Sequence, residues 1–191
     1  GVVSAAFQTQ IEIFDGFDPD YGASRTDIAA NVVGGVIGGL KVAYPEKLAW
    51  FDAKYSYHIS PYYDESVSSN AVLGYLGNAI KDYDGITYWF VLHPSELVSE
   101  EDRWPEWISL AVGYSGTNLA HAISGQSEAR NKGLPNVHKR QLFLSLDFGL
   151  IERLPLPKAL RPVQTFFSFV HLPAPTLSIG AGGNRWYWLY Y

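Results

Sequence analysis

Cysteine and methionine are both absent from this 191-residue chain, and charged residues are scarce. Without cysteine there are no disulfides, no zinc–thiolate sites and no thiol nucleophile. Charged residues make up 17% of the chain, against about a quarter in typical soluble domains. A water-facing surface would therefore have few charged side chains. The net charge of −5 and the pI near 5.5 argue against a phosphate-binding surface and therefore against nucleic acid as a partner.

No stretch of about 18 apolar residues, the length that a helix needs to cross a bilayer, occurs in the chain. The two nearest candidates, residues 1–14 and 28–44, are interrupted by polar residues or glycine, so single-pass insertion is not supported. Residue 1 is glycine rather than methionine. We therefore expect a processed or truncated start, with any export signal or lipid anchor lying outside this chain.

Hydrophobic residues are plentiful, at 47% of the chain, and aromatic residues make up 15%. This composition over 191 residues is enough for one domain with a substantial core. We find no internal repeat or linker. The chain is therefore predicted to be a single domain, residues 1–191, in which residues 1–45 form a helical hairpin and residues 46–191 a β-rich part with short inserted helices.

Two segments near the N-terminus have helical patterns. Residues 2–14 are apolar on nearly every side. After a turn rich in glycine and aspartate, Ser24 and Asp27 form a capping box at the start of a second helix, which should end before Pro45. Its glycines have the four-residue spacing that lets helix backbones approach closely, and each costs about 0.5–1 kcal/mol without such packing. We predict helix packing at Gly34, Gly35, Gly38 and Gly39.

From residue 50 onward the hydrophobic pattern changes to the two-residue alternation of β-strands. Strands are predicted at residues 50–60, 86–93, 107–115, 140–151, 176–180 and 184–191, and short helices at residues 69–81 and between Pro162 and Val170. The predicted fold class is α+β. A Gly-rich helix pair packs with an antiparallel, aromatic-rich sheet of about six strands, which is either curved or a partial barrel.

Aromatic residues gather in and beside the predicted strands, most densely at the C-terminus. Amphipathic rings at strand ends suit a membrane interface, and a chain that ends on an aromatic strand resembles the end of an outer-membrane protein. The alternative is a soluble sheet, in which β-propensity alone favours tyrosine and tryptophan. The predicted membrane-interface aromatics are Trp186, Tyr187, Trp188, Tyr190 and Tyr191.

Polar residues cluster where the two predicted helices meet. We call Glu12, Asp15, Arg25, Asp27 and Asn31 the acidic corner. Carboxylates within an apolar helix pair are costly unless they are paired or hydrogen-bonded. The corner is therefore a candidate for proton transfer, metal binding or contact with a lipid head group. The alternative is structural: Asp27 caps its own helix, and the other carboxylates pair with Arg25 or with loop amides.

Other motifs give little support for a metal site, a catalytic serine or a phosphate-binding loop. The five histidines lack metal-ligand spacing, and no motif for a metal or cofactor is present. Ser115 stands in Gly113-Tyr-Ser115-Gly116, which lacks the second glycine of the Gly-x-Ser-x-Gly elbow, so a serine hydrolase of that kind is rejected. Residues 180–183 are interpreted as a hairpin turn rather than a phosphate loop, because no Lys-Ser/Thr or helix follows them.

The most specific pattern in the chain spans both predicted helices: Glu12, Asp15-Gly16, Gly22-x-Ser24-x-x-Asp27, Asn31 and Gly34/Gly35. Together with KDYDGITYWF, WISLAVGYSG, RQLFLSLDFGLIERLP and LPAPTLSI, it resembles the YfiM-like family of predicted periplasmic lipoproteins, in its longer Bacteroidetes-type members. The resemblance covers essentially the whole chain. The helix pattern is also similar to the Glu…Asp…Asn…Gly pattern of VanZ-like proteins. The resemblance implies an envelope location and a helix-plus-strand fold, and it implies no particular reaction.

These features favour a non-enzymatic protein of the bacterial cell envelope, associated with the outer membrane or its periplasmic face, as a structural or accessory subunit of a larger assembly. The expected partners are other envelope or outer-membrane proteins and lipid. Two alternatives stay open. One is an envelope enzyme that uses Glu12, Asp15 and Asp27 on lipid or cell-wall precursors. The other is a lipid-binding protein with an apolar pocket between helices and sheet.

Overall fold

The computed structural model describes residues 25–60, 82–99, 104–117, 139–151, 153–180 and 183–190. The chain divides into two compact units, residues 1–49 and 50–191. This boundary lies close to the one that the sequence suggests between the helical and the β-rich part. The two units are described separately below.

The described part of the first unit is one helix, α2 (Arg25–Ala43). The N–H of Tyr44 donates to the Leu40 carbonyl at 2.8 Å at its end, and Pro45 follows, which disfavours a helical conformation at the residue before it. The end predicted from the sequence is therefore confirmed, whereas the predicted partner helix at residues 2–14 lies outside the described residues. In the described part of the chain, no helix is both long and apolar enough to cross a bilayer.

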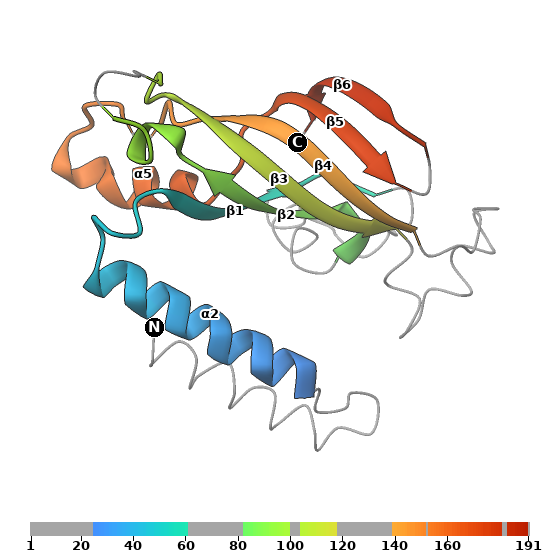
Figure 1. Ribbon diagram of the computed structural model, residues 1–191, viewed down its shortest axis with the longest axis horizontal. Helices are drawn as coiled ribbons and strands as arrows, with labels where there is room; N and C mark the ends of the chain where they lie inside the picture. The colour runs from blue at the N-terminus through green and yellow to red at the C-terminus, as the bar shows by residue number, and fades with distance from the viewer. Residues whose placement is uncertain are drawn as a thin grey trace. The chain divides into compact units, whose positions relative to one another are not determined.

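The second unit is built on a six-stranded antiparallel sheet in which the strands lie side by side in chain order (Figure 1). The strands are β1 (Phe51–Tyr57), β2 (Ile86–Leu92), β3 (Ile108–Thr117), β4 (Lys139–Phe148), β5 (Ala174–Gly180) and β6 (Arg185–Tyr190). Each overlaps a strand predicted from two-residue alternation, so the α+β class is confirmed. The sheet is not closed into a barrel, since β1 and β6 are its edge strands.

Short helical elements complete the second unit. They are η2 (Tyr83–Gly85), η3 (Pro94–Glu96), η6 (Lys158–Leu160) and α5 (Arg161–Ser168). The helix α5 confirms the one predicted between Pro162 and Val170, and Pro162 stands in its first turn, where a missing N–H costs nothing. The predicted helix at residues 69–81 lies outside the described residues.

The free edge of β1 is partly covered by the segment that leads from α5 into β5. Tyr55 forms a parallel bridge with Val170. The Tyr55 N–H donates to the Phe169 carbonyl at 2.8 Å, and the His171 N–H donates to the Tyr55 carbonyl at 2.9 Å. These bonds satisfy main-chain groups at an exposed sheet edge, and they fix His171 beside β1.

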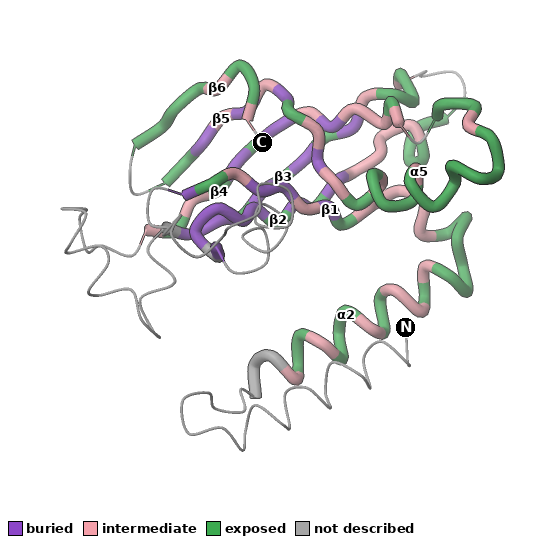
Figure 2. The backbone as a smooth tube through the Cα atoms, turned by 180° about the vertical axis from the view of Figure 1, so that it is seen from behind, coloured by how far each residue is buried: buried purple, intermediate pink, exposed green. Residues whose placement is uncertain are grey.

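The two faces of the sheet have opposite polarity, and the face rich in polar groups is the buried one. Figure 2 shows that the buried residues lie mainly along the strands of the sheet. Its buried polar side chains are Lys54, Ser56, Thr87, Ser109, Ser115, Ser145, Asp147, Thr176 and Ser178; we call this the inner face. The outer face is apolar and exposed, with Tyr88, Phe90, Leu110, Val112, Tyr114, Leu142, Leu144, Ile179, Trp186 and Trp188. A half-buried antiparallel sheet normally shows the reverse arrangement, with the apolar side chains inside.

The apolar part of the inner face is a small cluster of Trp89, Val91, Ala111 and Phe143, with Tyr190 packed against it. The Trp89 ring fits over Gly113, its partner across β2 and β3. A Cβ atom added at Gly113 would lie 2.7 Å from carbon atoms of that ring, closer than van der Waals contact allows. The large ring therefore requires a residue without a side chain opposite it.

Replacing Gly113 with alanine is expected to lower the free energy of unfolding by about 1–3 kcal/mol, the usual cost of overpacking a core. The Trp89 ring cannot easily move away, since it is stacked on His171 and contacts Phe143. Chemical denaturation followed by tryptophan fluorescence measures the change. Val112→Ala, at the exposed neighbour in the same strand, is the control and should shift stability less. Equal stability of Gly113→Ala and the wild type would contradict the packing described.

Candidate functional site

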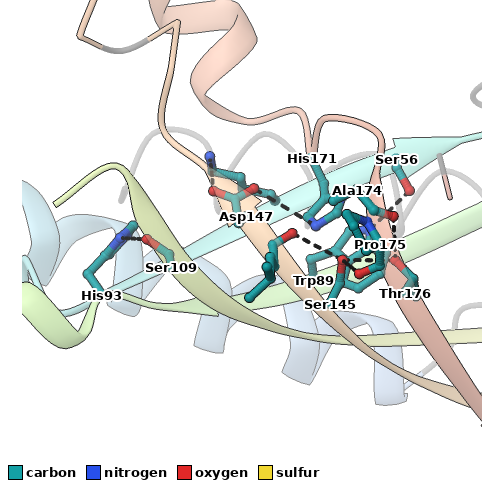
Figure 3. A network of polar contacts seen from close by, with 12 residues as sticks. Ser56, Trp89, His93, Ser109, Ser145, Asp147, His171, Ala174, Pro175 and Thr176 are labelled. Atoms are coloured by element: carbon teal, nitrogen blue, oxygen red, sulfur yellow. Dashed lines mark hydrogen bonds and ion pairs between the residues drawn. The ribbon is translucent and has the colours of Figure 1, made fainter. Parts of the chain in front are cut away.

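The polar groups of the inner face form two adjoining networks near one end of the sheet. The first joins three strands of the chain: Asp52 lies in β1, His93 directly follows β2, and Ser109 lies in β3. The Nδ1 atom of His93 lies 2.7 Å from the Ser109 Oγ, and its Nε2 atom lies 2.9 Å from the Asp52 Oδ2. Figure 3 shows the His93 ring directed at Ser109. Two hydrogen bonds thus link a hydroxyl, an imidazole and a carboxylate, in that order.

The carboxylate fixes which nitrogen of His93 carries the proton. An ionised carboxylate can only accept hydrogen bonds, so the Nε2–H must donate to Asp52 in the neutral ring. The Nδ1 atom is then left with its lone pair and accepts the hydrogen bond of the Ser109 hydroxyl. Asp52 and His93 have 43% and 19% of their side chains exposed, whereas Ser109 is 2% exposed. The network thus leads from the solvent to a buried hydroxyl.

The second network contains a buried ion pair. The Lys54 Nζ atom lies 2.8 Å from the Asp147 Oδ2 atom, with 3% and 1% of the two side chains exposed. Removing two charges from water is costly, and close approach in a low-dielectric interior offsets that cost. Lys54 comes from β1 and Asp147 from β4, so the pair spans the inner face from β1 to β4. Asp147 is also the direct partner of Ser109 across β3 and β4, which makes the two networks neighbours.

His171 completes the second network. Its ring is stacked on Trp89, with 4.0 Å between ring centroids and 9° between the planes, and its Nε2 atom lies 3.9 Å from the Asp147 Oδ1 atom. That distance is too long for a hydrogen bond. Burial, and secondly the Lys54 ammonium, lower the pKa of His171 from 6.5 to about 4, and the main chain at Leu146 acts in the opposite direction. His171 is therefore neutral at pH 7.

Hydroxyl groups continue the polar surface from these charges along the inner face (Figure 3). The Trp89 Nε1–H donates to the Ser56 Oγ at 2.9 Å, and the Thr176 hydroxyl donates to the Ser145 Oγ at 2.8 Å. The Thr87 hydroxyl is hydrogen-bonded to the Tyr190 hydroxyl at 3.0 Å. Burial raises the pKa of Tyr190, although the bond to Thr87 opposes this, so the phenol is neutral at physiological pH.

These networks differ in the chemistry that they permit. The Asp52–His93–Ser109 network has the parts of an activated nucleophile: a hydroxyl, a base in contact with it and a third group that orients the base. In the Lys54–Asp147 pair, both charges are used in holding strands together. Within the described ranges, no group of three or more histidine and carboxylate side chains is placed to hold a metal ion.

The structure brings together different residues from those predicted as the acidic corner. Glu12 and Asp15 lie outside the described residues. Arg25 and Asp27 belong to the first turns of α2, but their side chains are not described. Asn31 lies in α2 and is partly exposed. The acidic corner therefore stays a prediction.

The predicted packing glycines lie in α2, and Cβ atoms added at Gly34, Gly38 and Gly39 would meet nothing within 4 Å. Their predicted partner helix lies outside the described residues, so packing at these positions, as at Gly35, stays a prediction.

The predicted membrane-interface aromatics separate between the two faces of the sheet. Trp186 and Trp188 are exposed on the outer face, and their place at a membrane interface stays a prediction. Tyr190 instead packs on Phe143 with 4.5 Å between ring centroids and belongs to the inner face. Tyr187 is partly buried beside Tyr190, and Tyr191 lies outside the described residues.

Sequence reasoning missed the Asp52–His93–Ser109 network, because no local motif contains it. The sequence motif pointed instead to Ser115. Its hydroxyl donates to the Ile86 carbonyl at 2.7 Å, so this serine helps to hold the strands together. A signal was nevertheless present. Two-residue alternation assigns Asp52 and Ser109 to definite faces of their strands, and pairing β1 with β2 and β2 with β3 would have placed both near His93.

No protein-family model matches the chain, and comparisons with curated proteins and with solved structures found no similar protein.

Proposed function

We propose that this protein is a component of the bacterial cell envelope that rests on the outer membrane, with the outer face of its sheet in contact with lipid. In this role it is a structural or accessory subunit of a larger envelope assembly. The observation that carries the proposal is the inverted polarity of the sheet: polar and charged side chains are buried on the inner face, and apolar side chains are exposed on the outer face.

Inverted polarity is what a sheet in contact with lipid requires. Strands that face hydrocarbon alternate between apolar residues outside and polar residues inside, whereas a sheet that faces water does the opposite. A contiguous exposed apolar surface over several strands is also uncommon on soluble monomers. The outer face extends over β2 to β6, from Tyr88 through Val112 and Leu144 to Trp186.

Lipid fits this face better than a protein partner does. Interfaces between proteins carry about one hydrogen bond per 100–200 Å² and have a polar rim. The exposed large apolar and aromatic side chains of the outer face carry polar atoms only on Tyr88, Tyr114 and the tryptophan rings, and the charged Arg140 lies at the beginning of β4 beside them. Tryptophan and tyrosine are the residues enriched where hydrocarbon meets head groups, and Trp186 and Trp188 are exposed at the β6 edge.

Flotation with vesicles of phosphatidylethanolamine and phosphatidylglycerol tests the proposal. The wild-type chain should float with the vesicles, and Val112→Asp/Leu144→Asp, at paired positions of the outer face, should remain at the bottom. Each aspartate is expected to weaken lipid partitioning by about 1–3 kcal/mol, roughly 5- to 150-fold, because apolar burial is lost and a charge is introduced.

Leu160→Asp is the matched control. Leu160 is exposed to a similar extent but lies in η6 and not in a strand, and its replacement should leave flotation unchanged. Circular dichroism checks that all variants are folded. The proposal is wrong if the wild-type protein stays monomeric in detergent-free buffer and does not float. The outer face would then be covered by another segment of the chain, and a lipid-independent dimer would instead identify a second copy.

A further inference from the structure

We propose that Ser109 is a nucleophile that His93 activates, and that this chain cleaves carboxylic esters. The proposal rests on the two hydrogen bonds of His93, 2.7 Å to the Ser109 Oγ and 2.9 Å to the Asp52 Oδ2. It goes beyond the proposed contact with lipid and does not depend on it.

The proton positions are those that base catalysis needs. Because Asp52 accepts the Nε2–H, the Nδ1 atom of His93 is the free base, and it already holds the hydrogen bond of the hydroxyl that it would deprotonate. A base must lie within hydrogen-bond reach of the proton that it abstracts, and it does so here. Nucleophile, base and orienting group are recognised by geometry and not by their order in the sequence.

The contact of Ser109 differs from those of other buried hydroxyls on the inner face. Ser115 donates to the Ile86 carbonyl, and Ser145 donates to the main-chain carbonyls of Leu146 and Pro175. A carbonyl oxygen holds a hydroxyl in place but cannot take its proton at neutral pH. Ser109 faces an imidazole nitrogen, which can. The difference singles out one serine among several with similar burial.

The surroundings of Ser109 indicate from which side a substrate enters. His93 and Asp52 are partly exposed, so the network opens to solvent at this end of the sheet. Because Ser109 itself is buried, the ester carbonyl must enter from the His93 side and the serine side chain must turn toward it.

The reaction proceeds by acyl transfer in two steps. The Ser109 Oγ attacks the carbonyl carbon while its proton passes to the Nδ1 of His93, and Asp52 stabilises the imidazolium that forms. Collapse of the tetrahedral intermediate breaks the bond to the alcohol oxygen, which leaves with the proton from His93. Water then attacks the acyl-serine ester, its proton passes to His93, and the carboxylic acid is released as the Ser109 hydroxyl is restored.

A fluorophosphonate probe tests the nucleophile directly, because it forms a Ser–O–P bond with loss of fluoride only where a serine is activated. The full chain should be labelled once, and peptide mass spectrometry should place the label on Ser109. Ser115→Ala is the matched control, since Ser115 lies in the same strand and on the same face, and this variant should be labelled at the wild-type rate. Absence of label on the folded wild-type chain, or label on another residue, overturns the proposal.

The roles of His93 and Asp52 are tested by the rate at which the probe labels variants of these two residues. His93→Gln keeps a hydrogen-bonding side chain but removes the base, and its rate should fall about 10²-fold or more. Asp52 is a positioning residue, so Asp52→Asn should lower the rate and Asp52→Glu should restore part of it. Wild-type rates in all three variants would show that the network is only structural. With p-nitrophenyl acetate, the wild-type chain should release p-nitrophenol and Ser109→Ala should not; equal rates overturn the assignment of Ser109 as the nucleophile.

Discussion

Replacing Lys54 with methionine is expected to lower the free energy of unfolding by about 3–5 kcal/mol, because it leaves the Asp147 carboxylate buried without its cation. Both side chains are almost fully buried and only 2.8 Å apart. Whole domains are stable by about 5–15 kcal/mol, so this one change removes a large part of the stability of the sheet. Urea denaturation at pH 7, followed by tryptophan fluorescence, measures the loss.

The double variant Lys54→Met/Asp147→Leu separates the ion pair from simple packing. Removing both charges eliminates the uncompensated carboxylate, so the double variant should recover most of the stability that Lys54→Met loses. An apolar pair of similar volume can even be more stable than a buried ion pair. If the losses of Lys54→Met and Asp147→Leu instead add up in the double variant, the two charges do not act as a pair.

Acidification is expected to destabilise the protein through His171. Its pKa is about 4 in the folded state, against 6.5 for an unperturbed histidine, so between these values the unfolded chain binds a proton that the folded chain does not. The contribution of His171 to stability is therefore fully present above pH 6.5 and is lost as the pH falls towards 4. Below pH 4 this group causes little further loss. The shift corresponds to about 3 kcal/mol.

Unfolding free energies at intervals from pH 7.5 to pH 4, for the wild type and for His171→Asn, measure this contribution. Asparagine does not titrate, so the difference between the two curves isolates His171 from the carboxylates that also titrate in this range. The wild-type slope should exceed that of the variant by up to about 1.4 kcal/mol per pH unit between pH 6.5 and pH 4. Parallel curves would mean that His171 has an ordinary pKa in the folded protein.

The strands are the part of the fold that sequence pattern predicts well. Alternation over residues 50–60 identified β1, including the shared face of Lys54 and Ser56, and alternation over residues 140–151 identified β4. These patterns are local, since neighbouring side chains of any strand point to opposite faces. The same reasoning could not say which face is buried, because alternation is compatible with either choice.

The candidate site was not predictable for a related reason. Ser109 lies 16 residues from His93, and His93 lies 41 residues from Asp52. Contacts at such separations depend on strand order and register, which a single sequence does not specify. The acidic corner, in contrast, was predicted from residues that are close in sequence. Such proximity is not by itself evidence of a site.

The sequence alone determined that this chain has no thiol chemistry, little surface charge, a helix ending before Pro45 and a set of alternating strands after residue 50. It also determined which side chains share a face. Only the tertiary structure decided that the face with Lys54, Ser109 and Asp147 turns inward while the apolar face stays exposed. The physical reason is that alternation belongs to each strand, whereas burial depends on which partner strands, up to 93 residues apart for Lys54 and Asp147, bring opposite charges and hydroxyls together.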